Sequence, residues 1–200
     1  IILAHDSKEM LAGGDDMKKW WAETRPGWPL TVYPPEYETG LGDEGKEKLV
    51  EWTKAGGTMY TIGASTGYAI EALDLPITDT VKGLGAKEFH CPGSTLRVEV
   101  ENTHPAAYGM PEDALALFWG SPAFKVNPGP NNHMYEVLAV YPDSDILESG
   151  WLVGEEKIAD KIAAIYAHVG EGHVVLMGPR VQHRCQTHGT FKLLFNSLLG

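Results

Sequence analysis

The chain has 200 residues, and 43% of them are hydrophobic, so it is long enough to bury the core of one domain. Its 27 acidic and 16 basic residues give a formal net charge of −11, which disfavours nucleic acids and anionic membrane surfaces as partners. No apolar run approaches the roughly 20 residues of a membrane-spanning helix, and no signal-peptide pattern begins the chain. The 2 cysteines are too few for a disulfide framework and leave the redox compartment open.

The first part of the chain alternates between strand and helix patterns. Its opening apolar run is typical of a buried strand. A Pro/Gly loop over 33–42 precedes a helix that Asp43 is placed to cap. Gly56 and Gly57 are expected to end that helix, because glycine readily adopts the left-handed C-cap conformation. The expected elements are a strand at 1–4, helices at 15–23 and 44–54, a strand at 58–62 and a helix at 68–73.

The rest of the chain has mostly strand patterns. Apolar and polar residues alternate over 96–101, as in a strand with one buried face. Short turns join several of these runs, which favours antiparallel neighbours. The expected strands lie at 96–101, 115–119, 136–141, 151–153, 162–168 and 174–177, and a closing helix lies at 190–199.

The order of these elements predicts an α/β fold. The helix, strand, Gly-rich turn and helix over 44–73 follow the order of a parallel sheet covered on both faces. We therefore expect a single domain over 1–200, flavodoxin-like, with a mostly parallel sheet, helices on both faces and a β-rich antiparallel extension. That extension is expected as an insertion over 86–155. The chain opens on an apolar run without an initiator Met, so we also expect a longer polypeptide whose first strand and helix precede Ile1.

The turn over 63–67 has the pattern G-x-S-x-G. In serine hydrolases this pattern presents the nucleophile at a sharp turn between a strand and a helix, where backbone N–H groups can stabilise an oxyanion. Ser65 would need a base, and His183 or His188 after the last strand could supply it. Neither histidine has an acidic residue close to it in the sequence. A tight strand-to-helix turn is the simpler interpretation of the same pattern.

Metal ligands gather in the loop before the closing helix. His183, Cys185 and His188 lie within a few residues of one another, and imidazole and thiolate suit zinc. The positive charges of Arg180 and Arg184 oppose a cation there, and the loop lacks a fourth ligand. The alternative is a structural loop whose side chains bind backbone carbonyls. We expect that structural role, and neither a metal nor a cofactor in this domain.

Two other histidines form weaker patterns. His133 and Glu136 have the H-x-x-E spacing of a zinc carboxypeptidase, but they lie between a loop and a strand and lack a distant third ligand. His5 and Asp6 follow the first strand, at the edge where α/β proteins bind ligands. Such a pair is more often a loop cap, so both sites are weak candidates.

Aromatic residues gather near the Pro-rich loops. Trp20, Trp21 and Trp28 could form a platform for a sugar or a peptide, together with Tyr33 and Tyr37. Aromatic residues in such loops more often pack the loop against the core. The sequence leaves both interpretations open.

Several stretches of the chain resemble one family. They look like the class I glutamine amidotransferase-like domain at the C-terminus of bacterial zinc carboxypeptidase-like proteins. The resemblance covers nearly the whole chain, and its last stretch is specific. The stretches are 40–45 (GLGDEG), 55–58 (AGGT), 91–100 (CPGSTLRVEV), 104–111 (HPAAYGMP), 149–152 (SGWL) and 186–196 (QTHGTFKLLFN).

The resemblance implies an appendage of an upstream peptidase domain in an exported protein, secreted or periplasmic. The zinc site would lie in that upstream domain. Class I amidotransferases use a Cys at the elbow and a His-x-Glu pair near the C-terminus. Here Ser65 matches the elbow, and His188 is followed by Gly189 and Thr190, so the resemblance implies a fold without glutaminase chemistry.

Three hypotheses about function follow. The leading one is a non-catalytic accessory domain of a secreted zinc carboxypeptidase-like protein, which packs on the peptidase domain or binds a substrate or partner. The first alternative is a serine hydrolase that uses Ser65 with a C-terminal histidine. The second is a carbohydrate- or peptide-binding module.

Overall fold

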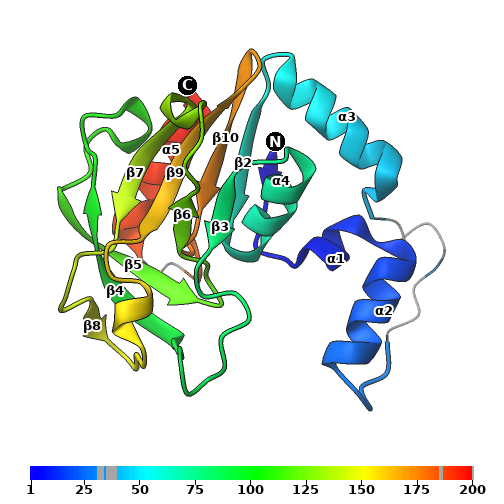
Figure 1. Cartoon of the computed structure of the whole chain (residues 1–200), viewed down its shortest axis with the longest axis horizontal. Helices are drawn as coiled ribbons and strands as arrows, with labels where there is room; N and C mark the ends of the chain where they lie inside the picture. Colours follow the sequence, from blue (N-terminus) through cyan, green and yellow to red (C-terminus); the bar gives the residue numbers. More distant parts are fainter. Residues whose placement is uncertain (31–33, 35–39, 185–186, 200) are drawn as a thin grey trace.

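The computed structural model describes residues 1–30, 34, 40–184 and 187–199. The chain folds around one strongly curled sheet, whose main strands lie in the order β1-β2-β10-β9-β7-β4-β5 (Figure 1). These strands are β1 (Ile2–Leu3), β2 (Thr58–Ile62), β4 (Pro92–Val100), β5 (Asp113–Trp119), β7 (Tyr135–Val140), β9 (Ile162–Val169) and β10 (Gly172–Met177). The shorter strands β3 (Ile77–Asp79), β6 (Phe124–Val126) and β8 (Leu147–Ser149) flank this order.

The sheet is mixed and mostly antiparallel, which corrects the expectation of a mostly parallel sheet. Among the described strands, β1, β2 and β10 pair in parallel, whereas β10, β9, β7, β4 and β5 pair antiparallel in succession. A parallel neighbour requires a crossover of about a dozen residues or more. Gly170 and Glu171 alone join β9 to β10, so these strands must run antiparallel. The α/β class is confirmed, but the expected direction of most strands is wrong.

The curl of the sheet brings the segment after β10 close to β5, the last strand in the order. The backbone N–H of Arg180 donates to the carbonyl of Leu117 on β5 at 2.9 Å. The two residues form an isolated antiparallel bridge, although β10 lies inside the strand order and β5 lies at its end. The end of the sheet therefore lies close to the carboxyl end of β10.

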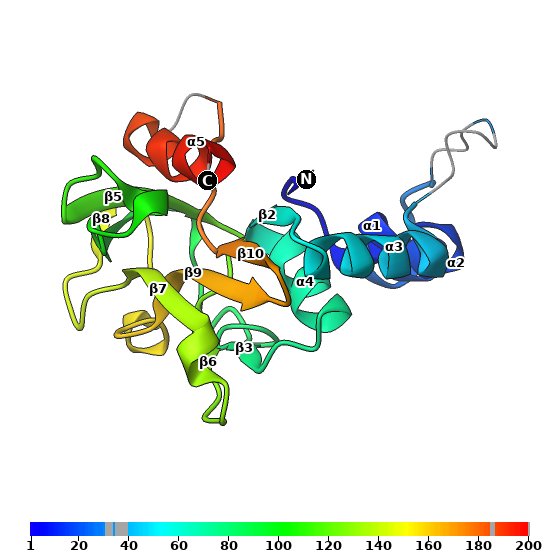
Figure 2. The ribbon, with the colours of Figure 1, turned by 90° about the horizontal axis from the view of Figure 1, so that it is seen from above.

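Helices cover both faces of the parallel strands, as expected. The helices α3 (Gly42–Lys54) and α4 (Thr66–Ala72) lie on one face, where Leu49 and Tyr68 share a core with Met59 of β2. On the other face lies α5 (Phe191–Leu199), whose Leu193 shares a second core with Tyr60 of β2. Met59 and Tyr60 reach different cores because successive side chains of a strand point to opposite faces. Figure 2 shows α5 on its own side of the strands.

Two helices near the N-terminus project away from the sheet beside α3 (Figures 1 and 2). The helix α2 (Gly14–Thr24) confirms the one expected at 15–23, whereas α1 (Lys8–Ala12) was not expected. Ser7 caps α1, because its hydroxyl accepts a hydrogen bond from Met10 N at 3.3 Å. Neither helix has a buried residue. These helices therefore contribute little to the core.

Most of the other expected elements are present, with two corrections. The run 151–153 is not a strand: Val153 makes an isolated bridge, and flanking Gly150 and Gly154 have φ angles of 115° and 77°, which turn the chain on both sides. Asp43 is not a cap, because it lies inside the first turn of α3 without a capping hydrogen bond. Gly56, with φ of 111°, follows the end of α3 as expected.

The boundaries of the expected insertion at 86–155 stay a prediction. That range contains β4, β5, β6, β7 and β8, which join the same sheet as the parallel strands. Leu96 of β4 and Tyr60 of β2 belong to one buried cluster, so the antiparallel strands share a core with the parallel ones. Among the described residues, no helix combines the length and the apolar character that a membrane span requires.

Candidate functional site

The site most suited to function lies at the carboxyl ends of the three parallel strands. Ligands of α/β proteins usually bind at this edge, because loops that follow neighbouring parallel strands meet there. His5 follows β1, Gly63 follows β2, and Arg180 follows β10. The end of β5 contributes Trp119. The structure therefore joins residues from four separate parts of the sequence.

The sharp turn after β2 is made by a glycine. Gly63 has a φ of 58°, in the left-handed region, and a Cβ placed on it would lie 2.0 Å from Nδ1 of His5. Ser65 instead has φ of −67° and ψ of −18°, which are ordinary helical values, within the 3-10 turn Gly63–Ser65. The position at the elbow therefore has no side chain, and the expected match of Ser65 to that position is not what the geometry shows.

Ser65 ties two parallel strands together. Its side chain is fully buried, and its Oγ accepts a hydrogen bond from Ile62 N at 2.9 Å. The hydroxyl proton can be donated to the carbonyl of Leu3 at 2.9 Å or to that of Ile62 at 3.0 Å. No described histidine is hydrogen-bonded to this hydroxyl. The contacts are those of a structural serine that joins the end of β1 to the end of β2.

His5 is held between the turn and an arginine. Ala64 N points at Nδ1 of His5 at 3.2 Å, and Nη2 of Arg180 lies 2.8 Å from Nε2. Burial, followed by the positive charge of Arg180, lowers the pKa of His5 to about 4. The ring is therefore neutral at physiological pH. Asp6 is a local cap, since its Oδ1 accepts from Ser7 N at 2.8 Å.

Arg180 lies at the centre of this edge. Its Nε donates to the carbonyl of Trp119 at 3.0 Å, and its guanidinium lies 4.9 Å from the centroid of the Trp119 ring. Its Nη1 lies 3.4 Å from Nδ1 of His183. Burial lowers the pKa of Arg180, although an arginine stays charged at any physiological pH. The sequence suggested this residue only as a charge that opposes a metal.

His183 belongs to the site, whereas His188 does not contact it. The His183 ring lies edge-on to Trp119 with centroids 5.0 Å apart, and its buried Nε2 has no hydrogen-bond partner among the described residues. His188 is exposed and lies beside Phe191 at the start of α5. Cys185 lies outside the described residues. Within the described part of the chain, no three His, Cys, Asp or Glu side chains are arranged to hold a metal.

A cavity of about 660 Å³ opens beside the same edge. Ala64 and Gly120 line it near His5, and Asp79, Cys91 and Phe118 line it farther along. Burial raises the pKa of Asp79 and of Cys91, so the Cys91 thiol is protonated at neutral pH and is a poor nucleophile. Neither residue was expected at a site, because both lie in short segments without a chemical motif.

The tryptophans expected as a platform form a separate surface on the projecting helices. Trp21 Nε1 donates to the carbonyl of Trp28 at 3.2 Å, and the Trp28 side chain is 72% exposed. The guanidinium of Arg25 lies 4.7 Å from the Trp21 ring centroid and 5.9 Å from that of Trp20. Tyr33 and Tyr37 lie outside the described residues. The tryptophans do gather, but an arginine already covers part of them.

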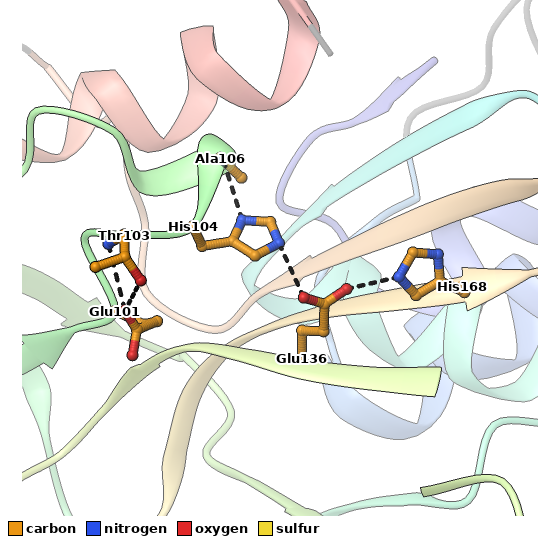
Figure 3. A network of polar contacts seen from close by, with 6 residues as sticks. All are labelled: Glu101, Thr103, His104, Ala106, Glu136 and His168. Carbon is orange, nitrogen blue, oxygen red and sulfur yellow. Dashed lines mark hydrogen bonds and ion pairs between the residues drawn. The ribbon is translucent and has the colours of Figure 1, made fainter. Parts of the chain in front are cut away.

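The H-x-x-E pair is split between two structures. His133 lies in a 3-10 turn (Asn132–Met134), whereas Glu136 lies on β7. Glu136 contacts two other histidines instead, His168 at 2.6 Å and His104 at 3.5 Å (Figure 3). This carboxylate therefore contacts His104 and His168 on the sheet and does not form a zinc site with His133.

The chain is similar to several solved structures at low sequence identity. No protein-family model matches the chain, and no curated protein matches it significantly. A cytoplasmic protein from Salmonella typhimurium is 12% identical over 100% of this chain and 70% of its own, with a TM-score of 0.51. A beta-galactosidase from Bacillus circulans sp. alkalophilus is 12% identical over 78% of this chain, with a TM-score of 0.47. A protein from Thermoplasma acidophilum, provisionally identified as part of a GMP synthase, is 8% identical over 78% of this chain and 63% of its own, with a TM-score of 0.47.

These similarities describe architecture and not activity. This chain spans 20% of the length of the beta-galactosidase. The Salmonella protein, at 12% identity, shows a shared fold alone. Any function must therefore be argued from the site.

Proposed function

We propose that this chain is a non-catalytic accessory domain, amidotransferase-like in fold, of a secreted zinc carboxypeptidase-like protein. The observation that carries this proposal is the turn after β2. There Gly63 provides no side chain, and the nearby Ser65 is buried and hydrogen-bonded to the backbone. A covalent catalyst needs an exposed nucleophile at that place with a base beside it. The sequence resemblance supplies the kind of parent protein.

The remaining groups support a role without glutaminase chemistry. Cys91 is buried, and its Sγ lies 3.9 Å from the carbonyl of Phe118 without a histidine partner among the described residues. His183, which the sequence offered as a base for Ser65, contacts Arg180 and Trp119 and has no carboxylate partner among the described residues. The proposed partner is the peptidase domain of the same polypeptide, which would hold the zinc.

A fluorophosphonate probe tests the proposal directly. Because the Ser65 hydroxyl is buried, we expect no labelling of the native protein under conditions that fully label a known serine hydrolase. Labelling that disappears in the Ser65→Ala variant would show a reactive serine and would favour the serine hydrolase instead.

The reading frame upstream of Ile1 tests the proposed parent protein. We expect it to encode a peptidase domain with its own H-x-x-E pair and a distant histidine. A short leader and nothing more upstream would contradict the accessory role.

A carbohydrate or peptide ligand at Trp28 is the second candidate. The exposure of Trp28 and its contact with Trp21 favour it. On a glycan array, binding that is lost in the Trp21→Ala variant would support this candidate, and an array without binding would count against a sugar ligand.

A further inference from the structure

Arg180 is a partly buried cation without an anionic partner among the described residues. The chain has 27 acidic residues, yet no carboxylate of the described residues lies within ion-pair distance of this guanidinium. Its neighbours are a carbonyl, an indole ring and two imidazoles. Lys8 and Arg97, which are partly buried like Arg180, pair with carboxylates by contrast. A partly desolvated charge without a counter-ion is unfavourable, and an anionic ligand would offset that cost.

Two N–H groups of Arg180 have no partner in the described structure. A guanidinium has five N–H groups. Nε uses its single one on the Trp119 carbonyl, and Nη1 and Nη2 each direct one towards an imidazole nitrogen, of His183 and His5 respectively. One N–H therefore remains on each terminal nitrogen. Two such groups on neighbouring nitrogens match the two oxygens of one carboxylate.

The two imidazoles leave a donor unpartnered and no acceptor free. If Nδ1 of His183 accepts from Arg180, its proton is on Nε2, which is buried and unpartnered among the described residues. His5 faces a donor at each of its nitrogens, Ala64 N and Arg180 Nη2. A neutral imidazole can accept at only one of them, so its own N–H opposes another donor. The cluster thus has an excess of donors that an acceptor would relieve.

We propose that Arg180, His5 and His183 form a binding site for a carboxylate ligand at the carboxyl edge of the parallel strands. The site supplies one fixed positive charge, that of Arg180; Asp6 lies beside His5 and is not ion-paired with the guanidinium. A monoanion matches that balance, whereas a phosphate dianion would add a second negative charge to a chain whose net charge is already −11.

The surroundings fit an acid that has an apolar part. Trp119, which is 43% exposed, lies beside the guanidinium, and Ala64 and Gly120, which neighbour His5, line the cavity of about 660 Å³. A ligand bound through its carboxylate could extend along either surface. The C-terminus of a peptide and a small free acid share this chemistry. The site does not depend on the accessory role, because it needs only these side chains.

Calorimetric titration of the whole chain tests the site. The probes are acetyl-trialanine with a free carboxylate, its C-terminal amide, sodium acetate and inorganic phosphate at constant ionic strength. We expect the peptide acid to bind at least about tenfold more tightly than the amide, because the amide lacks the charge that Arg180 would bind. Binding of acetate as well would indicate a small free acid, and binding of the peptide alone would indicate a peptide C-terminus.

Two arginine variants identify the residue responsible. Arg180→Gln should weaken binding of the peptide acid at least about tenfold. Arg97→Gln is the control, because Arg97 is also a partly buried arginine but already pairs with Asp145 and Glu148, and this variant should bind like the native protein. Arg180→Lys keeps the charge but loses the paired geometry, so its affinity should be intermediate. This variant provides the test if Arg180→Gln does not fold.

Three outcomes would overturn the carboxylate site. Equal binding of the acid and the amide would exclude recognition of the charge. Unchanged binding in both Arg180 variants would place the ligand elsewhere. Tighter binding of phosphate than of every carboxylate would show that the site selects a different anion. None of these results depends on fluorophosphonate labelling, so failure of the site and failure of the accessory role are distinguishable.

Discussion

At the scale of single residues, Gly63 shows how one position can decide the chemistry of a turn. Its φ of 58° lies in the left-handed region, and a Cβ added there would lie 2.0 Å from His5, so only glycine fits this position. The sequence pattern drew attention to Ser65, two residues later, because patterns record spacing and not backbone angles. A glycine at the sharp turn also explains how His5 can pack directly against the backbone there.

Replacing Gly63 by alanine should destabilise the protein by at least about 2 kcal/mol, since a methyl group would overlap His5 and strain the backbone. Gly27→Ala is the matched control: its φ is 83° but nothing lies within 4 Å, so it should cost only about 1 kcal/mol. Urea denaturation of both variants measures the difference. Equal costs would show that His5 does not occupy this space.

Acid should weaken the fold through His5. Its pKa is lowered from 6.5 to about 4 in the folded state, so the unfolded chain binds more protons between these values. The free energy of unfolding should therefore decrease as the pH falls from about 6.5 towards 4, by about 2 kcal/mol for this group once solvent screening of the half-buried ring is included. Burial also lowers the pKa of His173, which acts in the same direction. Denaturation at several pH values should show that the free energy of unfolding depends less on pH in His5→Gln than in the native protein.

At the scale of elements, the sequence predicted where most helices and strands lie but not how the strands pair. Alternation over 96–101 identified β4, and the apolar run over 174–177 identified β10. The direction of pairing depends on partners far apart in the chain, such as β10 between β2 and β9. Short-range periodicity has no information about those contacts. The helix α1 was missed because it is only five residues long.

The join between β1 and β2 should depend on Ser65. Ser65→Ala leaves the buried N–H of Ile62 and the carbonyl of Leu3 without this hydroxyl, which should cost about 1–3 kcal/mol. Ser144→Ala, at an exposed serine, should change stability by less than about 0.5 kcal/mol. Thermal unfolding of both variants checks this. Similar melting temperatures would mean that the hydroxyl does not hold the strands together.

At the scale of the whole molecule, the curl of the sheet explains why the sequence predicted only part of the site. His5, His183 and the edge of the sheet could be chosen from the sequence, because they follow strands. Arg180 and Trp119 could not be joined to them, since the curl of the sheet brings β5 to the segment after β10. That curl is a property of the complete sheet.

The two cores should unfold together. Leu176 and Met177 are neighbours on β10 that are buried in the cores on opposite faces of the sheet. Replacing either by alanine should cost about 2–5 kcal/mol, whereas Leu199→Ala, at a residue 87% exposed, should cost far less. Denaturation followed by both tryptophan fluorescence and circular dichroism should give one transition in each variant. Two separate transitions would show that the faces fold independently.

The bridge between Arg180 and Leu117 has a consequence for solubility. An open strand at the end of a sheet offers unpaired N–H and C=O groups to the same strand of another molecule, and so invites aggregation. Here the backbone of Arg180 occupies the Leu117 carbonyl of β5. The segment that places the guanidinium at the site thus also blocks pairing at Leu117 with the same strand of another copy of the chain.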